Sequence, residues 1–122
     1  MLINSFFKIC NYYTENDTII FTIELIDDHP LYAGHFPERA IVPGVCSIGI
    51  IKECASFYLQ KPLRFCTLDH CKFLKPIEPL INKSLSVTIK IQAIETSTFF
   101  ISGSIFSMNS CFVTIKSKTI IL

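Results

Sequence analysis

The fold is constrained most by one segment that can form a long helix. The rest of the chain has the sequence patterns of strands. Val42 to Gln60 has no proline after Pro43, and proline suits a first helical turn, where a missing amide hydrogen costs nothing. Its apolar residues are spread almost completely around a helix of about five turns. We therefore expect a central helix that is buried on most of its faces, as if a sheet were wrapped around it.

Strand patterns flank this segment on both sides. Ile19 to Leu25 alternates between apolar and polar residues, Phe6 to Tyr13 is a weaker strand before it, and Thr14 to Asp17 suits the turn between them. Four more strands are expected after the helix: Leu63–Lys75, Leu85–Ala93, Phe99–Met108 and Cys111–Leu122, the last two joined by a tight turn near Asn109-Ser110. This order predicts one α+β domain over residues 1–122, with a curled antiparallel sheet of about six strands around one helix.

The composition limits the classes of function. Half of the residues are apolar and only 17% are charged, an excess of apolar surface that self-association or an apolar ligand channel would cover. A net charge of +1 argues against nonspecific binding of nucleic acid. No apolar stretch approaches the roughly 20 residues of a membrane span, and the N-terminus lacks the pattern of a signal peptide. We expect a cytoplasmic protein.

Cysteines and two of the histidines are expected to be structural. No C-x-x-C spacing occurs among the cysteines, which have apolar neighbours and so suit small buried positions better than disulfides or zinc sites. His29 and His70 have no evident third ligand nearby, so we expect no metal. Tyrosine side chains could orient a substrate hydroxyl, but packing explains them better. The cysteines are Cys10, Cys46, Cys54, Cys66, Cys71 and Cys111.

The loop before the helix carries the residues best suited to chemistry. His35 is followed by Pro37 and Pro43, which stiffen the chain as it enters the helix. Gly44 lacks a side chain where the first unpaired helix amides point outward, so a carbonyl oxygen or oxyanion could bind there. A histidine beside such donors can remove a proton next to a thioester carbonyl. The alternative is a histidine that only caps or fills the loop.

The segment GHFPERAIVPGV, residues 34–45, resembles the active-site motif of the 3-hydroxyacyl carrier-protein dehydratases of fatty-acid synthesis. That motif reads G-H-F-P-G-x-P-x-x-P-G-V-L, followed by two further residues and then a glutamate. PLYAGHFP is similar to the family's lead-in, and LDHCKFLKPIEP, Leu68 to Pro79, is similar to one of its strands. The resemblance implies the hot-dog fold, in which the sheet encloses the helix.

The resemblance also implies a reaction and a site. His35 would be the base for the α-proton of a 3-hydroxyacyl thioester, the amide of Gly44 would polarise its carbonyl, and water would be eliminated to give a trans-2-enoyl thioester. The product would enter fatty-acid synthesis or a related acyl-chain pathway that makes a pigment or polyketide-like compound. The acyl chain would lie in a tunnel beside the helix. Further substrate-binding residues would be Phe36, Pro43, Val45 and Gly49.

Partners follow from the same resemblance. The substrate would be carried on the phosphopantetheine of an acyl carrier protein or of coenzyme A, with no other cofactor. Family members pair their sheets edge to edge and share sites between protomers, which implies a homodimer. An acidic carrier protein could dock on cations near the tunnel mouth, for which the candidates are Arg39, Lys52, Lys61, Arg64, Lys72 and Lys75.

One position departs from the family motif and leaves alternatives open. Gly49 stands where the family has its catalytic glutamate. Glu53, one helical turn further on, could reach inward as the acid, or could pair with a neighbour or lie hydrated at the helix edge. His35 could instead return the proton itself, directly or through a water beside Gly49. Alternative functions are a hot-dog acyl thioesterase and a catalytically impaired acyl-binding subunit.

Overall fold

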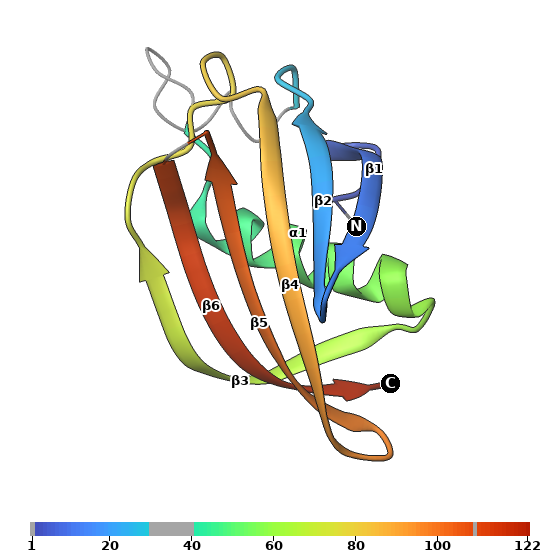
Figure 1. The fold of residues 1–122 in the computed structure, drawn as a ribbon. Helices are drawn as coiled ribbons and strands as arrows, with labels where there is room; N and C mark the ends of the chain where they lie inside the picture. Colours follow the sequence, from blue (N-terminus) through green and yellow to red (C-terminus); the bar gives the residue numbers. More distant parts are fainter. Residues whose placement is uncertain (1, 30–40, 109) are drawn as a thin grey trace.

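The computed structural model describes residues 2–29, 41–108 and 110–122. Figure 1 shows a curled sheet with the helix lying across one of its faces. The predicted order of two strands, one helix and four strands is confirmed, with bounds that shift by at most two residues at either end of each element. The elements are β1 (Phe7–Glu15), β2 (Thr18–Leu25), α1 (Gly44–Leu59), β3 (Leu63–Phe73), β4 (Ser84–Glu95), β5 (Thr98–Ser107) and β6 (Ser110–Ile121).

The six strands form one antiparallel sheet in the order β1-β2-β4-β5-β6-β3. β1 and β3 are therefore its two edges. Consecutive strands β4, β5 and β6 form a meander in the middle, whereas β3 follows the helix and joins the far side of β6 (Figure 1). This topology brings the end of β3 and the start of β6 to the same side of the molecule, next to the beginning of α1.

The core lies between the concave face of the sheet and one face of α1. In β2 every second side chain is buried, from Ile19 to Leu25, as the period of two predicts. Ile51 of α1 is fully buried and approaches β5 so closely that a Cβ atom at Gly103 would lie 2.5 Å from its Cγ2 atom. Only glycine at position 103 accommodates the helix at this distance from the sheet.

The expectation that α1 is buried on most faces is wrong. The sheet covers one side of the helix, so the buried residues fall in adjacent pairs one turn apart, and Val45 on the other side is 77% exposed. Near the end of the helix the ring of Tyr12 in β1 contacts those of Phe57 and Tyr58, which confirms packing as the role of Tyr12. The buried residues are Cys46, Ser47, Ile50, Ile51, Cys54 and Ala55.

All six cysteines are free, as expected, but only Cys46 and Cys54 are buried, while Cys71 and Cys111 are partly exposed. Cys10 and Cys66 are exposed, and each is the extra residue at a register shift in its strand, between Ile9 and Asn11 and between Phe65 and Thr67. Burial was predicted from the apolar neighbours of these cysteines, but a bulge of this kind interrupts the alternation of buried and exposed positions in a strand. Burial raises the pKa of the Cys46 thiol.

Cys54, deeper in the helix, is also protected from ionisation. Burial raises its pKa, and the neighbouring negative charge of Glu53 raises it further. Neither Cys46 nor Cys54 therefore supplies a thiolate nucleophile at neutral pH. Among the described residues no helix combines the length and hydropathy needed to cross a membrane.

Candidate functional site

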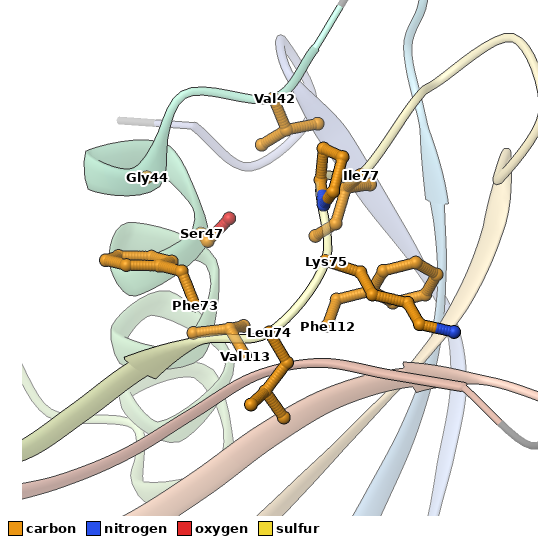
Figure 2. A pocket seen from close by; sticks show the side chains of 10 residues that line it. Val42, Gly44, Ser47, Phe73, Leu74, Lys75, Ile77, Phe112 and Val113 are labelled. Atoms are coloured by element: carbon orange, nitrogen blue, oxygen red, sulfur yellow. The ribbon is translucent and has the colours of Figure 1, made fainter.

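The first turn of α1 borders a cavity of about 400 Å³ (Figure 2). The cavity is framed by backbone hydrogen bonds: the Val42 amide donates to the Ile77 carbonyl at 2.8 Å, and the Leu74 amide donates to the Phe112 carbonyl at 2.7 Å. Most of the lining is apolar, as an acyl group requires. The lining residues are Val42, Gly44, Ser47, Phe73, Leu74, Lys75, Pro76, Ile77, Phe112 and Val113.

The N-terminus of α1 carries unused hydrogen-bond donors. Pro43 is the N-cap and provides no side-chain acceptor, and the first turn holds no acidic residue. The amides of Cys46 and Ser47 both donate to the Pro43 carbonyl, at 2.9 and 3.2 Å. Within the described part of the chain, no acceptor meets the amides of Gly44 and Val45. These two N–H groups and the helix dipole can together bind a carbonyl oxygen or an oxyanion.

Phe73, at the end of β3, packs directly on Gly44. A Cβ atom at position 44 would lie 3.0 Å from Cζ of the Phe73 ring, so the glycine allows the ring to cover the start of the helix. The ring is itself part of the cavity wall, and Phe73 is 56% exposed. Sequence reasoning did not select Phe73, although it lies within the segment Leu68–Pro79 that resembles a strand of the dehydratases.

Ser47 is the second residue that sequence reasoning missed. It is 3% exposed and lines the cavity one turn beyond Gly44. No hydrogen bond of its hydroxyl to any described residue is found. The available signal was chemical, since Ser47 has the only hydroxyl between Val42 and Ile51 in an otherwise apolar segment.

The predicted site residues are only partly brought together. His35, Phe36 and Arg39 lie outside the described residues, so their roles stay predictions. Gly44 lines the cavity and Pro43 immediately precedes it. Val45 is not among the described residues that line the cavity, although its amide has no acceptor among the described residues.

Glu53 is held by the N-terminal segment. Its carboxylate accepts hydrogen bonds from the Leu2 amide, at 3.0 and 2.8 Å to its two oxygens, and from the Ile3 amide at 2.8 Å. This geometry favours the expectation that Glu53 pairs with a neighbour. A catalytic role for Glu53 stays a prediction that its contacts do not support.

The expected open space beside Gly49 is not found. A Cβ atom at position 49 would lie 2.8 Å from Cδ1 of Leu2. The N-terminal segment that Glu53 anchors therefore covers the helix at the position where the related motif has a glutamate. A water beside Gly49 would need the Leu2 side chain to move away.

Replacing Glu53 with alanine should lower the free energy of unfolding by about 1 to 3 kcal/mol, because two backbone amides lose a charged acceptor. Urea denaturation followed by circular dichroism measures this. Glu95→Ala, at an exposed position at the end of β4, is the matched control and should change stability little. Equal midpoints for the two variants would show that the contacts of Glu53 with Leu2 and Ile3 do not stabilise the fold.

The remaining candidates behave as structural residues. His70 is exposed and its Nε2 atom lies 3.0 Å from the Thr114 hydroxyl, and the ring of His29 packs edge-on against Phe6. In residues 2–29, 41–108 and 110–122 no three potential metal ligands come together. Lys75 lines the cavity, and its ammonium group lies 3.4 Å from the Ser110 hydroxyl. Among the candidate docking cations that the structure describes, it is thus the one that lines this cavity.

Comparison with known families assigns the chain to a family. The family model described as ApeI-like, ApeI dehydratase, matches residues 11–110. The chain therefore belongs to the ApeI-like dehydratase family, and the resemblance to dehydratases is confirmed.

Curated relatives are similar over a shorter segment. The 3-hydroxyacyl-[acyl-carrier-protein] dehydratase FabZ of Rhodopseudomonas palustris (strain TIE-1) is 39% identical over a segment that covers 43% of this chain and 40% of the relative. FabZ of Bradyrhizobium diazoefficiens is 38% identical with the same coverage. The match thus spans less than half the length of these relatives.

Solved structures confirm the hot-dog fold. The dehydratase heterocomplex ApeI:P from Xenorhabdus doucetiae is similar with a TM-score of 0.70 and 18% identity, over 92% of this chain and 96% of that one. The putative thioesterase yhdA from Lactococcus lactis has a TM-score of 0.64 and 9% identity, over 97% and 93% of the two chains. At these identities the likeness shows the fold alone.

Proposed function

We propose that this protein eliminates water from a 3-hydroxyacyl thioester to give a trans-2-enoyl thioester. The observation that carries the proposal is the start of α1, where the Gly44 and Val45 amides have no acceptor among the described residues and Gly44 lines an apolar cavity. In a member of a dehydratase family, such donors suit the oxygen of the thioester carbonyl.

The proposed reaction uses one base and one set of oxyanion donors. His35 takes the proton from C2, and the electron pair moves toward the carbonyl, whose developing negative charge the Gly44 amide stabilises. The electrons then form the C2–C3 double bond as the 3-hydroxyl leaves, and the proton held by His35 joins it to form water. The atoms balance without a metal or an organic cofactor.

The proton donor for the leaving hydroxyl is the unusual feature of this proposal. Gly49 has no side chain to give a proton, and the Glu53 carboxylate accepts hydrogen bonds from Leu2 and Ile3. We therefore assign both the removal and the return of the proton to His35 in this proposal. A positioned general acid contributes about 10² to 10⁴ in rate, so turnover should be slow compared with a site that has one.

The two alternative functions differ in their support. A thioesterase needs a carboxylate or a similar group to activate water, but the only acid on α1 is Glu53, which faces the N-terminal segment. An acyl-binding subunit that lacks its own acid is favoured by the Leu2 side chain beside Gly49. Such a subunit would turn over substrate only when co-expressed with a competent homologue and only through the homologue's residues.

We also propose that the acyl group arrives on the phosphopantetheine of an acyl carrier protein and that the protein forms a homodimer. β3 is an edge of the sheet and carries the exposed apolar side chains of Leu68 and Phe73, so a second copy could pair there. Analytical ultracentrifugation tests this. Self-association predicts a mass of twice 13.9 kDa, and a monomer at all concentrations contradicts it.

The proposed function is tested by following the purified protein with 3-hydroxyacyl and 2-enoyl thioesters of pantetheine. Absorbance of the conjugated enoyl thioester should rise with the first substrate and fall with the second, because the enzyme catalyses both directions. A thiol reagent added in parallel should detect no free pantetheine. Thiol release without enoyl formation would support the thioesterase, and no conversion of either substrate would contradict both enzymatic functions.

A further inference from the structure

The Ser47 hydroxyl is a buried polar group that nothing in the described structure satisfies. It is 3% exposed, and its own amide, but not its hydroxyl, bonds to the Pro43 carbonyl. A buried hydroxyl without a partner costs free energy, and serine in a helix commonly bonds back to the carbonyl four residues earlier. The Ser47 hydroxyl makes no such bond and has no other partner among the described residues. A hydrogen bond to a ligand would therefore remove the free-energy cost of burying it.

The hydroxyl lies where a ligand could supply that partner. Figure 2 shows the Ser47 oxygen pointing away from the helix toward the space that Val42 and Ile77 border. Among the described residues that line this cavity, the side chains other than that of Ser47 are apolar, except for Lys75 at its other side. A single hydroxyl in such a lining fixes where one polar atom of the ligand is placed.

Ser47 also has a defined position relative to the Gly44 amide. The two residues are three apart, so they lie on the same side of the helix, with an axial rise of about 4.5 Å between them. In a 3-hydroxyacyl thioester the carbonyl carbon and the hydroxyl-bearing carbon are two bonds apart, so their oxygens are separated by a similar few ångströms. A carbonyl oxygen on the Gly44 amide thus brings the 3-oxygen to the level of Ser47.

We propose that Ser47 is a substrate-binding residue whose hydroxyl donates a hydrogen bond to the 3-oxygen of a 3-hydroxyacyl thioester held by the Gly44 amide. This inference rests on the proposed function and adds a source of specificity to it. The hydroxyl distinguishes a 3-hydroxyacyl group from a saturated one, because the saturated group leaves Ser47 buried and unpaired. The 2-enoyl product also lacks the 3-oxygen, so its binding is weaker than that of the substrate.

The test compares two ligands that cannot react. Amides of pantetheine with a 3-hydroxyacyl group and with the matching saturated acyl group keep the carbonyl, but their C2 proton is too weakly acidic for elimination. Isothermal titration calorimetry with the wild-type protein should show the 3-hydroxyacyl amide binding about 3- to 10-fold more tightly. In Ser47→Ala this preference should vanish, with the affinity for the saturated amide unchanged or slightly higher.

Ser117→Ala is the matched control, because Ser117 is fully buried and its hydroxyl donates to the Lys118 carbonyl. It should keep the wild-type preference. If Ser47→Ala keeps that preference too, the role of Ser47 is overturned while the proposed function stands. If neither amide binds the wild-type protein, the proposed function itself fails, and this inference fails with it.

Discussion

Replacing Gly44 with proline should lower kcat for dehydration by about 10²- to 10³-fold, the usual effect of removing one oxyanion donor. Proline has no amide hydrogen, so the carbonyl oxygen of the thioester loses its partner at the start of α1. The helix itself should tolerate the change. Gly44 is the first helical residue, which proline favours, and Pro43 before it has φ −59° and ψ 143°, the extended conformation that a following proline requires.

Gly44→Ala separates the lost donor from the added bulk. Alanine brings the same Cβ atom to within 3.0 Å of the Phe73 ring, but it keeps the amide hydrogen. Because Phe73 is more than half exposed, its ring can move by the few tenths of an ångström needed. We expect kcat for Gly44→Ala within about tenfold of wild type. Equal losses of kcat in the two variants would mean that the steric contact with Phe73, and not the loss of the amide hydrogen, lowers the activity.

Replacing His35 with alanine should lower kcat by about 10²- to 10⁴-fold, because the proposed reaction has no second group to remove the C2 proton or to protonate the leaving hydroxyl. Steady-state assays with a 3-hydroxyacyl thioester measure the loss. The control is His70→Ala, since His70 is exposed on β3 and contacts Thr114.

Binding separates the chemical role of His35 from a structural one. His35→Ala should still bind the unreactive 3-hydroxyacyl amide, since the Gly44 amide and Ser47 are unchanged. A variant that loses both binding and turnover would indicate that His35 shapes the loop. If His35→Ala kept full turnover, His35 would not be the base of the reaction.

The local patterns of the sequence were sufficient to predict the order of the helix and the strands. Alternation from Ile19 to Leu25 and the long segment after Pro43 specify a strand and a helix through short-range geometry. The apolar neighbours of Cys10 and Cys66 wrongly predicted burial, because each lies at a bulge, which adds one residue to a strand and has no signal in the nearby sequence. The apolar residues around α1 likewise suggested burial on most faces, whereas the sheet covers only one side of the helix.

Residues of the site could be predicted only where residues suited to catalysis lie close together in one segment of the sequence. Gly44 could be selected because a glycine after a proline at a helix start leaves amides free. The contacts that fill the space beside Gly49 and hold the Glu53 carboxylate come from Leu2, about fifty residues away in the chain. No sequence pattern near the helix predicts these contacts. Phe73 is also distant from Gly44 in the chain and reaches it because β3 returns along the sheet to the start of α1.

A crystal structure of the complete protein with the unreactive 3-hydroxyacyl amide of pantetheine tests the central claim most directly. The account predicts that the carbonyl oxygen lies about 2.7 to 3.1 Å from the Gly44 nitrogen and that the His35 ring faces C2. It also predicts that the acyl chain enters the cavity between α1 and the strands β3 and β6. A carbonyl turned away from the start of α1, or an acyl chain bound elsewhere on the protein, would contradict it.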